Sequence, residues 1–196
     1  MNKGRLEAFS DGVLAIIITI MVLEMKVPHE PGFDGLKPLF PVFLSYLISF
    51  IYLGIYWNNH HHLLHSIKKV SGAVLWANLH LLFWLSLIPF VTGWMGENHF
   101  APATLALYGF VLLMAAIAYW ILAHLLIKHH GKESLLAKAL GHDVKGKISI
   151  LFYIIGIACT FFNHWLSGGL YILVALIWLI PDSRIEKAII EHSDLH

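Results

Sequence analysis

Six long apolar stretches, most of them separated by short polar segments, occupy most of this 196-residue chain. A helix needs about 17–25 such residues to cross roughly 30 Å of hydrocarbon, and most of the stretches reach that length. They are too continuous for the strands of an outer-membrane barrel, which alternate in character over about 10 residues each. The six stretches are Phe9–Met25, Leu39–Trp57, Val70–Met95, Ala103–Ile127, Ile148–Trp165 and Leu166–Ile180.

The composition excludes a soluble domain. Hydrophobic residues make up 58% of the chain, charged residues 13%, and the mean hydropathy is +0.72. Soluble domains carry about 45–50% apolar and about 25% charged residues, and at this size they could not enclose so much apolar surface. We predict an all-α membrane protein with six transmembrane helices in one domain, residues 1–196. The predicted spans are about 6–26, 38–58, 70–95, 102–127, 147–165 and 166–181.

The basic residues predict the orientation of these spans. If the N-terminus is cytoplasmic, 11 of the 13 Lys and Arg residues lie on the cytoplasmic side, and only Lys26 and Lys37 lie outside. Basic residues concentrate in the cytoplasmic loops of membrane proteins. We therefore expect a multi-pass protein of the cell membrane with both termini in the cytoplasm. The boundary between the fifth and sixth spans depends only on a short polar stretch, residues 163–169.

The first span has two distinct faces on a helical wheel of about 100° per residue. One narrow stripe carries Phe9, Ile16, Thr19, Ile20 and Leu23, whereas Ser10 and Asp11 lie on the opposite side. The stripe can face lipid, a neighbouring helix or a pore, and periodicity alone does not distinguish these environments. Ser10 and Asp11 are placed to reach neighbouring helices.

Two ionisable residues at the start of the first span require an explanation, because charges in membrane spans are costly and often functional. Arg5 can reach the membrane interface through its long side chain. Asp11 lies about two turns further in and needs a partner within the protein. Possible partners at the end of the second span are Trp57, Asn58 and His61.

The first span also resembles that of a known family. Its motif combines Arg5, Phe9-Ser10-Asp11, Ala15-Ile16, Thr19 and Leu23-Glu24, followed by Lys26-Val27-Pro28. This string is similar to the first helix of bacterial members of the transmembrane protein 175 family of potassium channels. Weaker similarities are Tyr56–His61 and Ser86–Phe90, together with the six-span layout.

This resemblance implies a homotetramer in which the first helix of each subunit lines a central pore. Ile16 would then form an apolar constriction, continued by Ile20 and Leu23, and Thr19 would form a hydroxyl layer that favours potassium. Arg5, Phe9, Ser10 and Asp11 would belong to the network that packs this helix. Permeant ions would be K⁺ and other monovalent cations, and no cofactor, metal or nucleic acid is expected.

Other functional classes are less consistent with the sequence. The chain contains no Thr-Val-Gly-Tyr-Gly filter, so ion selectivity would not come from a carbonyl cage. It also lacks the catalytic motifs of common hydrolases, and we predict that it is not an enzyme. One alternative is a b-type haem electron carrier, because His80, His124 and His164 lie in or near spans. The other is a proton-coupled transporter that uses Asp11, Glu24 and the histidines as a relay.

Overall fold

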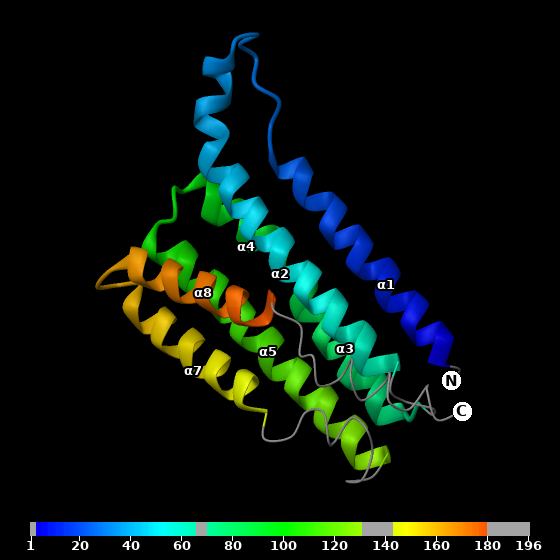
Figure 1. Ribbon diagram of the computed structural model, residues 1–196. Helices are drawn as coiled ribbons and strands as arrows, with labels where there is room; N and C mark the ends of the chain where they lie inside the picture. The colour runs from blue at the N-terminus through cyan, green and yellow to red at the C-terminus, as the bar shows by residue number, and fades with distance from the viewer. Residues whose placement is uncertain (1–2, 66–69, 131–142, 180–196) are drawn as a thin grey trace.

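The computed structural model describes residues 3–65, 70–130 and 143–179, and every regular element in these ranges is a helix. The elements are α1 (Lys3–Ile20), η1 (Met21–Glu24), η2 (Phe33–Leu39), α2 (Phe40–His65), α3 (Gly72–Ser86), α4 (Ile88–Glu97), α5 (Pro102–His130), α7 (Val144–Cys159) and α8 (His164–Leu179). Figure 1 shows α1, α2, α3–α4 and α5 side by side, with α7 and α8 as a helical hairpin at one edge.

Four helical segments are long and apolar enough to cross a bilayer: Lys3–Glu24, Phe33–Leu64, Gly72–Glu97 and Pro102–Lys128. They correspond to the first four predicted spans. α7 and α8 have 16 residues each, which gives roughly 24 Å of helix and is less than the hydrocarbon thickness. The structure therefore shows an all-α membrane protein with four clear span candidates.

Several predicted boundaries were wrong. The fifth predicted span ends at Cys159 instead of residue 165, because residues 160–163 form a turn and His164 already belongs to α8. Asn163 causes this restart, since its side-chain oxygen accepts hydrogen bonds from the backbone N–H groups of Trp165 and Leu166 at 3.1 and 3.3 Å. The second span begins earlier and ends later than predicted, because η2 leads into α2, which continues to His65.

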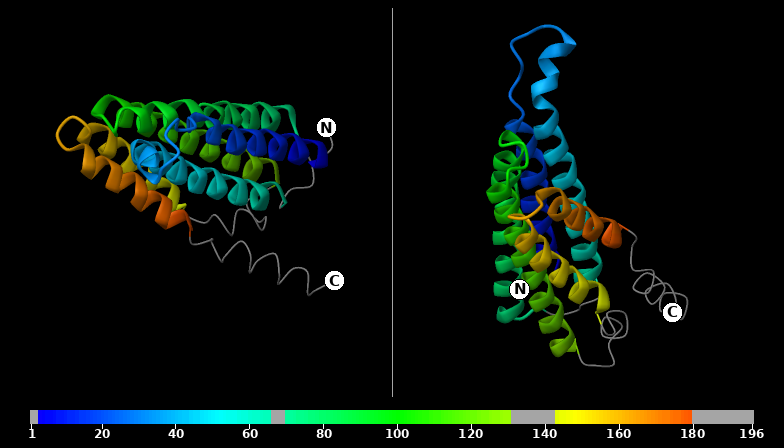
Figure 2. Two further views of the ribbon diagram at one scale, coloured as in Figure 1. Left: turned by 90° about the horizontal axis from the view of Figure 1, so that it is seen from above. Right: turned by 90° about the vertical axis from the view of Figure 1, so that its left-hand side faces the viewer.

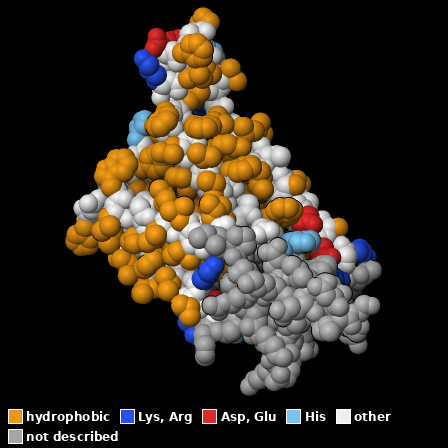
Figure 3. Space-filling view, viewed as in Figure 1, with side chains coloured by type: hydrophobic (Ala, Val, Ile, Leu, Met, Phe, Trp, Pro, Cys, Tyr) orange, Lys and Arg blue, Asp and Glu red, His pale blue; other side chains and the backbone are white. Residues whose placement is uncertain are grey.

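Part of the predicted topology lies outside the described residues. This part includes the C-terminus, the last two residues of the sixth predicted span, and six of the basic residues: Lys68, Lys69, Lys132, Lys138, Arg184 and Lys187. Figure 3 shows hydrophobic side chains across the middle of the visible face and charged side chains at the protruding tip and near the opposite end. That distribution is the one expected for a protein with an apolar belt in lipid.

Helix α5 occupies the centre of the bundle. It packs against α3, α4, α7 and α8, while α2 packs against α1, α4 and α8 (Figures 1 and 2). Pro89 separates α3 from α4, because proline has no N–H to donate and its ring clashes with the preceding turn. Helices α3 and α4 nevertheless follow one another closely enough to form a single apolar segment, 72–97.

Buried tyrosines connect α8 to the centre of the bundle. The hydroxyl of Tyr52 in α2 donates to the backbone oxygen of Tyr171 in α8 at 2.5 Å. The Tyr171 ring fills the space opposite Gly109 and Gly156, where a Cβ on either glycine would overlap it. The absence of side chains at these two positions therefore allows an aromatic ring to wedge between α5 and α7.

Gly96 allows a similarly close approach between α4 and α2. A Cβ built on Gly96 would lie 2.7 Å from the backbone Cα of Val42 and 2.5 Å from the hydroxyl oxygen of Ser45. A backbone atom cannot move aside without displacing its helix. We therefore expect Gly96→Ala to destabilise the fold by about 1–3 kcal/mol, as overpacking usually does. Thermal unfolding in detergent measures this loss.

The matched control is Gly54→Ala in α2, because nothing lies within 4 Å of a Cβ at that position. Alanine there should leave the unfolding temperature unchanged or raise it, since alanine favours a helix more than glycine does. Equal effects of the two substitutions would show that the α2–α4 contact is looser than described.

Candidate pore helix and the network that holds it

Helix α1 buries one face against the rest of the helical bundle and exposes the other. The buried residues are Leu6, Ser10, Leu14 and Ile17, followed by Met21 in η1. The exposed face carries large apolar side chains in spite of its exposure. They are Phe9 (52% exposed), Ile16 (61%), Ile20 (41%) and, in η1, Leu23 (75%). An exposed apolar stripe must meet lipid, another subunit or a pore.

Thr19 adds a hydroxyl to this exposed stripe. Its Oγ1 lies 2.9 Å from the backbone oxygen of Ala15 and 3.0 Å from that of Ile16, and donates its proton within the helix. The lone pairs of Oγ1 are then left as acceptors on the exposed side. A hydroxyl in this state can contact a cation but has no further proton to donate.

The helical wheel of about 100° per residue describes α1 only as far as Ile20, where the α-helix ends. The chain then tightens into the 3₁₀ turn η1, and Met25 is extended with its N–H bonded to the Val22 oxygen at 3.1 Å. Side chains rotate by about 120° per residue in a 3₁₀ helix, so Leu23, three residues after Ile20, returns to the same exposed face. Val22 is also exposed in this turn, at 43%.

The buried face of α1 is held by a directional chain of hydrogen bonds. His60 Nε2 lies 2.7 Å from Asn78 Oδ1, which can only accept, so the ring nitrogen donates. Asn78 Nδ2 donates to Ser10 Oγ at 3.0 Å, and Ser10 Oγ donates to the Leu6 oxygen at 2.8 Å. His60, Asn78 and Ser10 are at most 2% exposed. The chain joins α1, α2 and α3 inside an apolar interior.

A second bond joins α1 to α2 nearer the surface. Trp57 Nε1 donates to Asp11 Oδ1 at 3.1 Å, which brings one predicted partner to the carboxylate. Of the other predicted network residues, Arg5 is exposed, Asn58 is half-buried, and the ring of His61 lies against that of His62 with centroids 5.7 Å apart.

Sequence reasoning missed His60 and Asn78 as the residues that bridge α1 to its neighbours. A signal for Asn78 was present, since it is the only amide in the apolar run Val74–Leu85. A buried polar side chain in a membrane span needs a partner on another helix. Which helix supplies the partner depends on packing, which periodicity does not reveal.

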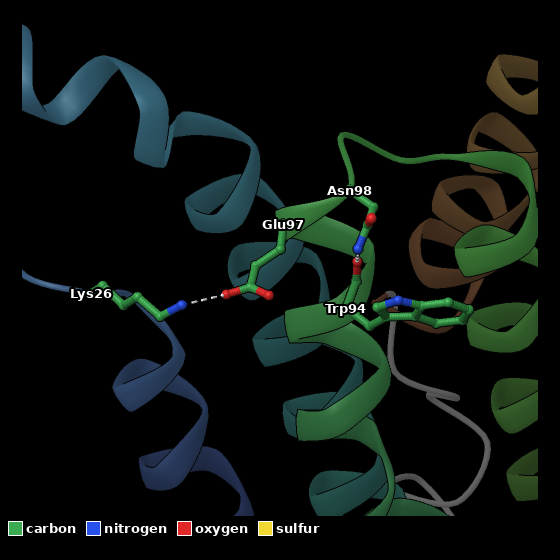
Figure 4. Close-up of polar contacts among 4 residues, drawn as sticks. All are labelled: Lys26, Trp94, Glu97 and Asn98. Carbon is green, nitrogen blue, oxygen red and sulfur yellow. Dashed lines mark hydrogen bonds and ion pairs between the residues drawn. The ribbon is translucent and has the colours of Figure 1, made fainter.

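The residues at and just after the end of η1 contact α4. Figure 4 shows Lys26 reaching Glu97, with Lys26 Nζ 3.0 Å from Glu97 Oε1. Beside it, Asn98 Nδ2 donates to the Trp94 oxygen at 2.8 Å and closes the end of α4. Glu24 also lies against α4, with a carboxylate oxygen 2.9 Å from a Cβ built on Gly93. The two basic residues predicted outside both have acidic partners, since Lys37 pairs with Asp34.

Comparison with known proteins identifies the family. A potassium channel of Chryseobacterium sp. (strain P1-3) is 59% identical over 192 residues, which cover 98% of this chain and all of that protein. The chain belongs to the TMEM175 family. A family model described as the endosomal/lysosomal potassium channel TMEM175 matches residues 5–89, the part that contains α1, α2 and α3.

Other TMEM175 relatives agree in sequence and fold. A potassium channel of Chamaesiphon minutus is 32% identical, covering 93% of this chain and 96% of that protein. The crystal structure of a lysosomal potassium-selective TMEM175 homologue from that organism superposes with a TM-score of 0.79 at 29% identity, over 92% of this chain and 97% of that one. The human endosomal/lysosomal proton channel TMEM175 is 34% identical over 86 residues, only 17% of its length. Ion channels are not enzymes, in line with the absence of catalytic motifs.

The buried hydrogen bonds of Asn78 with His60 and Ser10 provide a test of what positions α1. Asn78→Ala leaves the His60 N–H without an acceptor and Ser10 Oγ without a donor, so we expect a loss of about 1–3 kcal/mol for each stranded group. Denaturant unfolding in detergent measures it. The control is Asn98→Ala, which removes an exposed bond and should change stability little. If both variants lose the same free energy of unfolding, the buried hydrogen bonds of Asn78 do not hold α1 in place.

Proposed function

We propose that this protein is the subunit of a potassium-permeable cation channel. The observation that carries the proposal is the potassium channel of Chryseobacterium sp., to which the chain is 59% identical from end to end. The match covers 98% of this chain and all of that protein, so the whole chain and not one segment supports the proposal. The permeant ions would be K⁺ and, less favourably, other monovalent cations.

Four copies would surround a pore lined by α1, with the network on its buried face fixing each helix in its subunit. The exposed stripe of α1 supports this arrangement, because it is the face a subunit would offer to a central axis. Ile16 would form the narrowest apolar ring, and Ile20 and Leu23 would continue it outward. Rings of apolar side chains close a pore by excluding water, without a moving charge.

Six membrane passes with both termini in the cytoplasm, in the cell membrane, complete the proposal. Helices α7 and α8 support it through their composition and antiparallel course, since α7 ends and α8 begins beside the start of α5 (Figure 1). Their 16 residues are short for a flat bilayer. Flanking residues or local thinning of the bilayer would make up the difference.

Cation flux into liposomes tests the channel activity. Purified protein reconstituted in vesicles should dissipate a K⁺ gradient faster than a Na⁺ gradient, and empty vesicles should not. Flux that requires a proton gradient would instead indicate a coupled transporter. A Soret band with stoichiometric haem would favour the electron carrier. Two of the three histidines named for the haem alternative already contact tryptophans: His80 accepts from Trp84 at 2.9 Å, and His124 bonds the Trp120 oxygen at 2.9 Å.

The apolar ring can be tested by making it polar at constant size. Ile16→Asn supplies groups that retain water in the constriction, so K⁺ flux should rise while the preference for K⁺ over Na⁺ changes little. Ile18→Asn is the control, because Ile18 packs partly against the subunit core. A channel opened by Ile18→Asn and not by Ile16→Asn would place the pore on another face of α1.

The hydroxyl layer can be tested separately. Thr19→Val removes an oxygen that could replace part of the hydration shell of an ion, at nearly constant volume. We expect the K⁺ preference to fall more than the total flux, measured as relative permeability in bilayer recordings. Thr19→Ser, which keeps the hydroxyl, should preserve the preference. If Thr19→Val retains full selectivity, the preference for potassium arises elsewhere.

A further inference from the structure

A cavity of about 220 Å³ lies between α2, α4, α5 and α8, away from α1. Its walls are mostly apolar, and engineered apolar cavities of roughly 150 Å³ already accept benzene or xenon. The lining residues are Leu44, Ile48, Met95, Phe100, Leu105, Tyr108, His164, Trp165, Gly168, Gly169, Tyr171 and Ile172.

Two adjacent glycines in α8 create this hollow. Nothing lies within 4 Å of a Cβ built on Gly168 or Gly169, in contrast to Gly96, Gly109 and Gly156, which press against neighbouring helices. The space beside α8 is therefore open because side chains are missing there. Helix propensity alone disfavours two consecutive glycines within a helix by about 2 kcal/mol relative to alanine.

The hydroxyl groups of the wall already have partners within the protein. Tyr108 Oη lies 3.0 Å from Ser49 Oγ, and Tyr171 Oη donates to the Leu105 oxygen at 3.3 Å. An apolar molecule in the cavity would therefore displace no hydrogen bond from these groups. A water molecule would form few hydrogen bonds there, although it needs about two to four polar partners to be stable in a cavity.

The cavity lies in the half of the bundle nearer the 25–38 connection. Its residues come from the beginnings of α2, α5 and α8 and from the end of α4. Trp165, which is 71% exposed, and His164 stand at the first turn of α8, with ring centroids 5.0 Å apart. Tryptophan at a helix end is typical of the level of lipid headgroups. The cavity thus extends from this level toward the hydrocarbon.

We propose that this cavity binds one acyl chain of a phospholipid, whose headgroup lies beside His164 and Trp165. The acyl chain enters along the face left open by Gly168 and Gly169 and lies against Leu44, Ile48 and Ile172, which line the cavity and are accessible. The proposal does not depend on channel activity. It assigns α8 the role of holding a structural lipid against the end of α4. Glu97 at this end of α4 pairs with Lys26, which follows η1.

Photolabelling of the wild-type protein tests the proposal directly. Vesicles are prepared with a phosphatidylcholine that carries a diazirine in the middle of one acyl chain, and labelled residues are mapped by mass spectrometry. Leu44 and Ile48 of α2 line the cavity and are half-buried, whereas Leu47 and Phe50 of the same helix are exposed and lie outside the lining. We expect a chain in the cavity to label Leu44 and Ile48 more strongly than Leu47 and Phe50. Labelling confined to outward residues such as Leu173 and Leu176 would overturn the proposal.

Filling the hollow provides the second test. Gly169→Leu should abolish the stronger labelling of Leu44 and Ile48 and remove one retained phospholipid per subunit in native mass spectrometry. Leu176→Phe adds bulk to the exposed side of the same helix and should change neither measurement. Gly168→Leu serves if Gly169→Leu does not fold. Unchanged lipid retention and labelling in a folded glycine variant would show that the hollow is not the lipid site.

Discussion

An amide or hydroxyl buried in an apolar interior without a partner costs about 2–7 kcal/mol, and this penalty governs how the helices of the protein are joined. Helix α1 avoids this cost through the hydrogen bonds that run from His60 to Asn78 to Ser10 to the Leu6 oxygen, which give each of the three buried side chains a partner. The other polar cluster obeys the same rule, since Ser49 contacts both Thr92 and Tyr108. Each cluster joins helices that apolar packing alone would hold only loosely in lipid.

The consequence for function is a helix fixed on one side and open on the other. Because polar bonds hold the buried face of α1, its register relative to α2 and α3 is defined, and the apolar stripe is presented outward at a definite angle. The connection to α4 constrains the far end, where α1 gives way to a 3₁₀ turn and an extended residue. A pore built from such helices would have rigid walls supported by neighbours that do not touch the ion.

Glycine serves two opposite purposes in the bundle. Gly96, Gly109 and Gly156 let neighbouring atoms approach more closely than any side chain would permit, which pulls α2, α4, α5, α7 and α8 together. Gly168 and Gly169 have empty space beside them. The first use gives a dense subunit, and the second leaves a cavity that a lipid chain is suited to fill.

The sequence by itself determined the class of the protein and the two faces of α1. Uninterrupted apolar runs have no other stable form in lipid than helices, and the helical period up to Ile20 separates Ile16 from Ser10 whatever the neighbours are. The placement of Asp11 away from the stripe followed from the same period, and so did the need for a partner, although Trp57 could only be named as one of several candidates.

Only the tertiary structure decided which groups meet. The pairing of His60, Asn78 and Ser10 requires three helices to stand at particular heights, and no local pattern encodes the height of one helix against another. Boundaries at residues 21, 33 and 160 were missed for a related reason. Short 3₁₀ turns and a side-chain cap at Asn163 differ little from helix in local preference, so contacts with neighbouring segments select them.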